Sequence, residues 1–344
     1  KFYYKNDNPN IFNLNITAID AKKLPIALSW ANPIITRPRF LYSFNNVVIS
    51  PNDSHVYFYE INKLSSDLGS KFDSNMLSVF DFYGKNELLN SKKISGDVLH
   101  LGFSSNSKNF YHWIHEIYSR IIRVMEEYDI NKFKYIVMPK VDLKFQKEAL
   151  DILKIDFRKI LSEDQFYNCK GNLITLNIDS IASGIDIRNF FLKRREKKEI
   201  TYKKYFLDRD SNSGAQKREL INFDKFREKY IKAGFQFIKP ERLSLRDQID
   251  LFLSAKSLVG VHGSSFSLAS LMPRGSKVVE LFPKNYIDPA ISNICAASNL
   301  KYGFYVEDSF RPLSEKDWDR DANSKINAEL IDHDKVIDFL NNEY

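Results

Sequence analysis

The stretch LVGVHGSSFSLASLMPRGSKVVELFP, residues 258–283, holds the residues best suited to chemistry. His262 ends an apolar run and is followed directly by Gly263, Ser264 and Ser265. Ligands of open α/β sheets bind beyond the carboxyl ends of the strands. A helix that begins after such a turn offers N–H groups and partial positive charge, which suit a phosphate. We therefore predict that His262 and the turn bind a phosphate and stabilise charge on a leaving group.

Two other interpretations of this stretch stay open. A lone histidine in apolar surroundings is often only hydrogen-bonded to carbonyl groups of the core. Alternatively, Ser264 or Ser265 is the nucleophile of a hydrolase. The hydrolase interpretation is the weaker one, because the elbow pattern G-x-S-x-G lacks its second glycine here.

Other polar residues are expected near the same place. Glu280 lies near the end of an apolar run and has the position from which a carboxylate accepts ribose hydroxyls. Arg209 ends the run YFLDRD, and Arg218 follows it after a polar loop, so both are candidates for a diphosphate clamp. Gln248 is a candidate either for contacting the nucleobase of a bound nucleotide or for a structural role. The alternative to these binding roles is that Glu280 is an ordinary surface glutamate and that Arg209 and Arg218 are simply solvated.

A second candidate site lies in the first half of the chain. His112 and Glu116 are four residues apart in the pattern NFYHWIHEIYSRIIRVMEEY, residues 109–128, so they share one face of a helix. An imidazole beside a carboxylate can act as a general base with its orienting partner. An ordinary exposed polar pair is the alternative, which the many aromatic residues of this helix disfavour. His115 and Arg120 lie on the same helix.

The order of secondary-structure patterns predicts which elements position these residues. In the second half, apolar runs alternate with amphipathic segments, which indicates a parallel sheet covered by helices on both faces. The predicted strands there are 205–210, 236–240, 257–263, 277–283 and 302–308, and the predicted helices are 222–235, 244–255, 265–272 and 290–299. The first half is less regular. Its predicted strands are 46–50, 55–61, 78–84, 134–139 and 172–176, and its helices are 109–128 and 145–154.

We therefore predict an α/β protein with two domains and a tail. The boundaries are an α/β domain at 1–197 with an irregular β-rich start, a Rossmann-like domain at 198–316, and a tail at 317–344. The tail is expected to be helical and to pack back on the first domain. A chain of 344 residues is long enough for two cores.

Composition and charge restrict the class of protein. With 43% hydrophobic and 28% charged residues the chain is of globular type, and it has no apolar run long enough to cross a membrane. The net charge of +7 is concentrated in residues 188–206, where eight Lys or Arg stand against two Glu, 8 − 2 = +6. This segment is either a contact for anionic lipid or a polyanion, or a solvated linker helix. The two cysteines are far apart and predict neither a disulfide nor a zinc site.

Four motifs in order resemble those of glycosyltransferase family 61. They are Tyr111-His112-Trp113-Ile114-His115-Glu116; Asp208-Arg209 with Arg218 to Asn222; Gly234-Phe235, Pro240-Glu241, Leu243-Ser244 and Gln248-Ile249; and Ala255, Gly260, His262-Gly263, Pro273, Gly275-Ser276 and Glu280. The chain departs from the family pattern at Tyr111, which replaces a glycine, and at Ser264 and Ser265, which replace an alanine and a glycine. The resemblance covers residues 100–306 and leaves 1–95 unexplained.

The resemblance implies a GT-B architecture, in which two Rossmann-like domains face a cleft. It also implies sugar transfer from a nucleotide sugar with inversion and without an obligatory metal or other cofactor. The D-x-D triplet Asp208-Arg209-Asp210 lies where such a metal site could be, but it fits the arginine motif of the family better. By analogy, His262, Arg209 and Arg218 hold the diphosphate and Glu280 the ribose, and either Glu116 or His112 is the base.

We expect a UDP-linked donor and a glycan or lipid-linked acceptor in capsule or lipopolysaccharide synthesis, and no nucleic-acid partner. The composition, the few cysteines and the lack of a signal-like segment favour a bacterial cytoplasmic enzyme at the inner membrane face. A protein O-glycosyltransferase of the Golgi or ER lumen is the alternative location and role. Two other classes stay open. These are a non-catalytic glycan- or polyanion-binding protein that uses residues 188–206, and another nucleotide-dependent enzyme, which the absence of G-x-G-x-x-G and P-loop motifs disfavours.

Overall fold

The computed structural model describes most of the chain. The described residues are 11–12, 16–18, 34–35, 41–52, 54–58, 63–64, 90–103, 107–177, 180–195, 201–208, 219–283, 287–306 and 325–342. Arg209, Arg218 and the predicted strand 78–84 lie outside them.

The chain divides into two compact units. Unit 1 comprises residues 1–10 and 36–186, and unit 2 comprises residues 11–35 and 187–344. The division falls inside helix α7 (Ser180–Arg194). Unit 2 includes an N-terminal segment because strand β2 (Ile16–Ala18) pairs with strand β17 (Lys301–Val306). The boundaries inferred from the sequence stay predictions.

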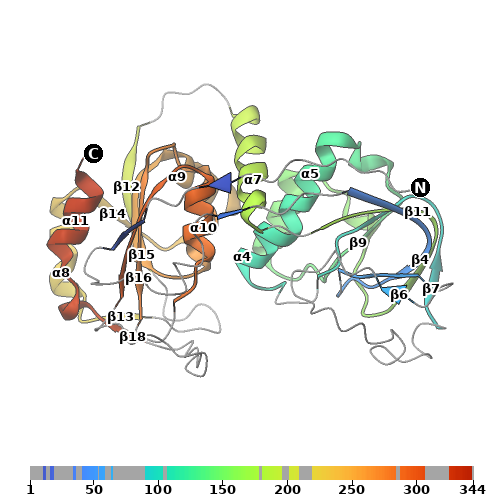
Figure 1. Ribbon diagram of the computed structural model, residues 1–344, viewed down its shortest axis with the longest axis horizontal. Coiled ribbons are helices and arrows are strands. Elements are labelled where there is room, and N and C mark those ends of the chain that lie inside the picture. Colours follow the sequence, from blue (N-terminus) through green and yellow to red (C-terminus); the bar gives the residue numbers. More distant parts are fainter. Residues whose placement is uncertain are drawn as a thin grey trace. The chain divides into compact units, whose positions relative to one another are not determined.

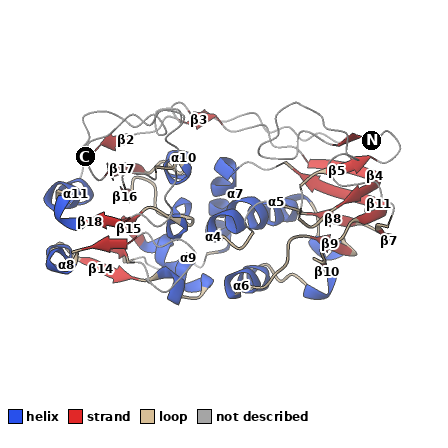
Figure 2. Cartoon of the chain, turned by 90° about the horizontal axis from the view of Figure 1, so that it is seen from below, coloured by secondary structure: helices blue, strands red, loops and turns tan. Residues whose placement is uncertain are grey.

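Unit 2 is built on a six-stranded sheet whose adjacent strands are all parallel. In sheet order the strands are β14 (Phe235–Ile238), β12 (Lys203–Leu207), β15 (Ala255–Val261), β16 (Lys277–Phe282), β17 and β2. Strands β15 and β16 are almost wholly buried on both faces. The predicted parallel sheet is thereby confirmed, and its predicted strands are found within a few residues of their expected limits (Figure 2).

Helices cover both faces of this sheet, as the alternation of patterns predicted (Figure 1). They are α8 (Asp224–Lys232), α9 (Leu245–Ser254), α10 (Ala290–Ala297) and α11 (His333–Asn341). Helices α8 and α11 share one core cluster, in which Tyr230 and Val336 pack with Phe206 and Val259 of the strands. Helix α9 begins as predicted, with Ser244 Oγ accepting from the backbone N–H of Asp247 at 3.1 Å.

The strand order places a ligand position at the carboxyl ends of β12 and β15. If β12, β14, β15, β16 and β17 are numbered one to five along the chain, their order in the sheet is 2-1-3-4-5. The connection from β12 leads to one side of it and the connection to β15 leads to the other, so the topological switch point lies between these two parallel strands. Open α/β sheets bind ligands at this topological switch point. Gly260 lets the two strands approach there, because a Cβ atom at this position would lie 2.8 Å from the Leu207 carbonyl oxygen. His262 follows β15 at this end of the sheet.

Unit 1 has a mixed sheet of eight strands. The path is β10 (Ile160–Leu161), β9 (Tyr135–Val137), β8 (Val98–His100), β11 (Tyr167–Leu176), β4 (Leu41–Ile49), β5 (Val56–Phe58) and β6 (Lys63–Leu64), with β7 (Lys92–Ile94) also beside β11. The pairs from β10 to β11 are parallel, whereas β11, β4, β5 and β6 pair antiparallel. The expected Rossmann-like sheet is therefore only half present in unit 1, because the β-rich start adds an antiparallel meander.

Two further small sheets and several short turns complete the described structure. The two-stranded sheets are β1 (Ile11–Phe12) with β3 (Ile34–Ile35), and β13 (Glu219–Ile221) with β18 (Lys325–Asn327). The 3-10 turns are η3 (Ile130–Lys132), η4 (Phe157–Lys159), η5 (Pro240–Arg242), η6 (Ser264–Phe266), η7 (Ala269–Leu271) and η8 (Ala328–Leu330). Helix α6 (Lys144–Ile152) is close to the helix predicted at 145–154.

The helix predicted at 109–128 is found as three joined parts. These are α4 (Phe110–His112), the π-helix η2 (Trp113–Tyr118) and α5 (Ser119–Glu127). Every residue from Trp113 to Val124 is buried. The aromatic-rich pattern thus belongs to a central helix of unit 1 and not to a surface helix.

Helix α11, near the C-terminal end of the chain, packs on the sheet of unit 2. Val336 and Leu340 of α11 belong to the core cluster of the parallel sheet. Ser257 Oγ donates to the Leu340 carbonyl at 3.0 Å and Lys277 Nζ donates to the Phe339 carbonyl at 2.7 Å, so both stabilise the end of the helix. The apolar face of α11 therefore covers the sheet of unit 2, and the packing of the tail on the first domain stays a prediction.

His333 at the start of α11 predicts a pH dependence of stability. Its Nδ1 is 3.0 Å from the Tyr230 hydroxyl and its Nε2 is 2.8 Å from the Ala328 carbonyl. Burial and the charge of Lys229 lower the pKa of His333 below its usual 6.5, and the nearby Asp332 and Asp334 oppose this only in part. The unfolded chain binds the proton more readily than the folded protein does. The contribution of neutral His333 to the free energy of unfolding is therefore complete above pH 6.5. It should fall as the pH drops from 6.5 through the lower folded pKa.

Urea titrations at pH 7.5 and pH 5.5 measure this effect. A His333→Gln variant should show a smaller loss of stability between the two pH values than the wild type. An equal loss in both proteins would show that His333 is not responsible.

No helix among the described residues is long and apolar enough to cross a membrane.

Candidate functional site

In unit 2, the strand end at His262 carries a buried imidazole–carboxylate pair. His262 Nδ1 lies 2.6 Å from Glu280 Oε1, and the two side chains are 7% and 0% exposed. The His262 backbone N–H donates to the Leu281 carbonyl at 3.0 Å, which extends the pairing of β15 with β16 by one residue. The imidazole also stacks on Phe282, with ring centres 4.8 Å apart. The ring is therefore held by a hydrogen bond, a stacking partner and its own backbone.

A third residue completes this group. The Tyr302 hydroxyl donates to Glu280 Oε2 at 2.8 Å, so both carboxylate oxygens have a partner. Burial and the charge of Glu280 raise the pKa values of Tyr302 and of the Cys295 thiol well above their usual ranges. Tyr302 therefore keeps its proton at neutral pH and acts as a donor. An ionised carboxylate only accepts hydrogen bonds, so an ionised Glu280 favours the His262 tautomer with its proton on Nδ1.

The surroundings of Glu280 bear on the ribose contact that the sequence predicted for it. A carboxylate that binds ribose hydroxyls must be accessible, but the Glu280 side chain is fully buried and both its oxygens are occupied. Strand β16 is central in the sheet and covered on both faces, which explains the burial. Glu280 holds His262 and Tyr302 in this structure, and a contact with ribose stays a prediction.

The turn after His262 also differs from its expected form. The helix predicted at 265–272 is replaced by the two 3-10 turns η6 and η7. Gly263 has φ 163° and ψ 179°, which is extended backbone rather than the left-handed turn that only glycine allows. A single 3-10 turn has little of the dipole of a full helix. Ser265 Oγ is buried, and it has no hydrogen-bond partner in the part of the chain that the structure describes.

Of the remaining residues expected at the donor site, Gln248 is the one that the structure describes. Gln248 is buried on α9, where its Nε2 lies 3.4 Å from the Leu243 carbonyl, which favours the structural role. Arg209 and Arg218 fall outside the described residues. The neighbouring Asp208 forms an ion pair with Arg227 at 3.0 Å.

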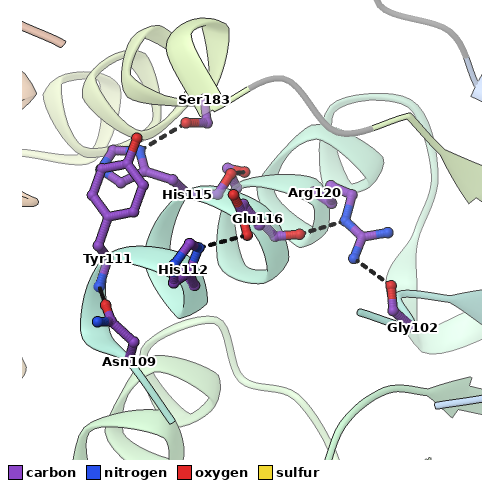
Figure 3. A network of polar contacts seen from close by, with 9 residues as sticks. Gly102, Asn109, Tyr111, His112, His115, Glu116, Arg120 and Ser183 are labelled. Carbon is purple, nitrogen blue, oxygen red and sulfur yellow. Dashed lines mark hydrogen bonds and ion pairs between the residues drawn. The ribbon is translucent and has the colours of Figure 1, made fainter. Parts of the chain in front are cut away.

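In unit 1, the second candidate pair lies at the start of the central helix. His112 Nδ1 is 2.9 Å from Glu116 Oε2, as the spacing of four residues predicted (Figure 3). The His112 side chain is 34% exposed, but that of Glu116 is only 7% exposed. The imidazole therefore presents a surface to solvent, and the carboxylate lies behind it.

The π-helix was not predicted, and it shapes this site. Its wider turn contains His115 and Glu116, and it closes with the Ser119 N–H bonded to the Ile114 carbonyl. Single π-helical turns inside α-helices occur frequently at functional sites. His115 Nδ1 lies 2.7 Å from Ser183 Oγ on α7, and its ring packs on Tyr111 at 4.6 Å. Figure 3 shows these contacts around the same helical turn.

Arg120 fixes the π-helix from within the unit. Its Nε donates to the Glu116 carbonyl at 2.5 Å, and its Nη2 donates to the carbonyls of Leu101 and Gly102 at 2.9 and 3.0 Å. Burial lowers the pKa of Arg120 to about 10, although the charge of Glu116 opposes this change. The guanidinium stays charged at neutral pH and connects the end of β8 with the backbone of Glu116.

The two sites share one arrangement. In each, a carboxylate that is largely or fully buried holds Nδ1 of a histidine, and this contact fixes the orientation of the imidazole ring. Ser183 and Tyr302 belong to these sites but were missed. The register Val278↔Tyr302 and Glu280↔Phe304 puts Tyr302 and Glu280 on one face of the sheet, so strand pairing would have identified Tyr302.

Taken together, the fold and the two sites define an α/β protein with a parallel-sheet unit and two histidine–carboxylate pairs whose carboxylates are buried. Residues 110–279 match the model of the family described as Glycosyltransferase 61. The resemblance to glycosyltransferase family 61 seen in the motifs is confirmed over this region. The family implies glycosyltransferase activity, with a nucleotide-sugar donor and a glycan acceptor. A search of curated proteins found no match.

Proposed function

We propose that this protein is an inverting glycosyltransferase that moves a sugar from a UDP-linked donor to a glycan or lipid-linked glycan acceptor. The observation that carries the proposal is the position of the family match, which includes both His262 and the His112–Glu116 pair. The synthesis of capsule or lipopolysaccharide is the role that we favour. A GT-B arrangement of the two units is part of the same proposal.

His112 is the better candidate for the base. It is the more exposed member of its pair, and Glu116 holds its Nδ1. In the proposed step, Nε2 of His112 takes the proton of the acceptor hydroxyl, and the hydroxyl oxygen bonds to the anomeric carbon. The bond from this carbon to the diphosphate breaks, and UDP leaves with the electron pair. One base and no covalent intermediate give inversion.

His262 is the better candidate for contacting the leaving diphosphate. It lies at the switch point of the parallel sheet, where such ligands bind. With Nδ1 held by Glu280, we propose that Nε2 is the ring nitrogen that donates to a phosphate oxygen of the bound donor. We propose that the backbone of Gly263, Ser264 and Ser265 and the side chains of Arg209 and Arg218 complete this contact.

A thermal-shift panel with UDP, GDP, CMP and TDP sugars tests the donor class. UDP or a UDP sugar should raise the melting temperature, because a ligand that binds only the folded state stabilises it by RT ln(1 + [L]/Kd). At one hundred times Kd the gain is about 2.7 kcal/mol. The proposed metal-independence predicts the same rise in the presence of EDTA. A rise with another nucleotide only would contradict the choice of UDP, and loss of the rise in EDTA would contradict the absence of a metal.

We also propose that the enzyme works at the inner face of a membrane through the basic segment 188–206. Leu192 and Tyr202 are 41% and 53% exposed beside its charges, although Arg188 and Lys204 are engaged with carbonyl groups of unit 2. Exposed apolar residues among basic ones suit an anionic bilayer surface. Sedimentation with anionic but not neutral vesicles, abolished by salt, is the expected result. Equal sedimentation with both would contradict it.

A further inference from the structure

We propose that Tyr302 is a positioning residue for His262, acting through Glu280. The inference rests on the proposed role of His262 and names a residue that none of the family motifs contains. The geometry is a chain of two hydrogen bonds, from the Tyr302 hydroxyl to Glu280 Oε2 at 2.8 Å and from Glu280 Oε1 to His262 Nδ1 at 2.6 Å. Tyr302 and Glu280 are 0% exposed, so water does not replace either bond.

The chain of bonds fixes both the tautomer and the orientation of the imidazole. An ionised carboxylate only accepts hydrogen bonds, so it selects the tautomer with the proton on Nδ1. Tyr302 fixes the second oxygen and prevents the carboxyl group from rotating about its bond to Cγ. Stacking on Phe282 then sets the plane of the ring. The outcome is that Nε2 has one direction before any ligand arrives, which is the pre-organisation that charge stabilisation requires.

The same chain of bonds affects the proton affinity of His262. The ionisable groups around the pair are Glu280 on β16, Tyr302 on β17, Cys295 on α10, and Asp288, whose charge acts on Tyr302. Of these, Glu280 alone contacts the imidazole as a carboxylate. The hydrogen bond from Tyr302 partly neutralises the negative charge of the Glu280 carboxylate. Without this hydrogen bond, the carboxylate attracts the proton of His262 more strongly. The pKa of His262 should therefore rise when the hydroxyl is deleted.

Nitrogen-15 NMR of the histidine side chains measures this without any assay of activity. The chain has six histidines, so the His262 signals can be assigned by their loss in a His262→Asn variant. In the wild type, the neutral ring should carry its proton on Nδ1. In Tyr302→Phe the pKa of His262 should rise by about half a pH unit, which is the lower end of what one hydrogen bond contributes. In Glu280→Gln it should fall.

Tyr305→Phe is the matched control, because Tyr305 lies on the same strand and its hydroxyl donates to the Leu330 carbonyl instead. It should leave the pKa of His262 unchanged. An unshifted pKa in Tyr302→Phe, or a wild-type ring with its proton on Nε2, would overturn the inference. The position of the proton on the wild-type His262 ring is measured without any variant, so this test remains decisive even if Tyr302→Phe folds poorly.

The kinetic readout separates this inference from the proposed function. Tyr302→Phe should lower kcat several-fold and leave KM for the acceptor unchanged. The tyrosine acts only through His262, which we propose contacts the leaving diphosphate and not the acceptor. If the pKa moves as expected while sugar transfer is absent in every protein, the positioning chain stands and the proposed function fails. If sugar transfer is present and the pKa of His262 does not change in Tyr302→Phe, the proposed function stands and the positioning role of Tyr302 fails.

Discussion

His112→Asn is expected to lower kcat for sugar transfer by about 10²- to 10⁴-fold, the usual contribution of a general base. The asparagine amide lies where imidazole Nδ1 lies, so it can still donate to Glu116 and the helix should keep its structure. The variant removes only Nε2, the atom that we expect to take the acceptor proton. Initial rates at saturating donor, together with the melting temperature, measure the effect.

The control is His55→Asn, which changes a histidine of the same unit outside both sites and should keep the wild-type rate. Glu116→Gln discriminates between the two candidate bases. If His112 is the base, Glu116→Gln should lose about 10- to 100-fold, as partners that orient a functional histidine usually do. If Glu116→Gln is inactive and His112→Asn keeps most of its activity, the carboxylate is the base and our assignment is wrong.

His262→Asn is expected to lower kcat by about 10²- to 10³-fold, because it removes a donor to charge that develops on the leaving group. Asparagine is preferable to alanine here. Removing the whole side chain would leave Glu280 with one donor fewer in a site that water does not reach, which costs about 1–3 kcal/mol. With asparagine the melting temperature should stay close to that of the wild type, and the shift caused by UDP should become smaller.

Donor hydrolysis and sugar transfer are measured in parallel in this variant. Tyr305→Phe again serves as the control for a buried change in the same sheet. If both reactions continue at the wild-type rate in His262→Asn, the histidine does not contact the donor, and the assignment of the donor site to unit 2 fails.

Much of unit 2 was predictable from local patterns. Its strands are apolar runs between clear turn signals, and Ser244 with Asp247 marks the start of α9 in the sequence as it does in the structure. The burial of Glu280 was predictable in principle, since it stands between Val279 and Leu281 in a strand that other strands flank on both sides. Its partner Tyr302 was not, because strand pairing between distant segments has no local signal.

The sites depart from prediction where tertiary contacts override local preference. Nothing in the sequence around His115 and Glu116 marks a π-helix, which Arg120 stabilises through carbonyls far along the chain. The turn after His262 has a helical pattern but packs as two 3-10 turns. The C-terminal helix has an apolar face, but only the finished sheet decides which unit that face covers.

The most direct test of the central claim is the release of nucleotide from a panel of nucleotide sugars by the wild type and by His262→Asn. The account predicts release from at least one UDP sugar by the wild type, stimulated by a glycan acceptor, and release that is lower by at least 10²-fold in the variant. Equal release by both proteins, or none from any sugar nucleotide with any acceptor, would contradict it.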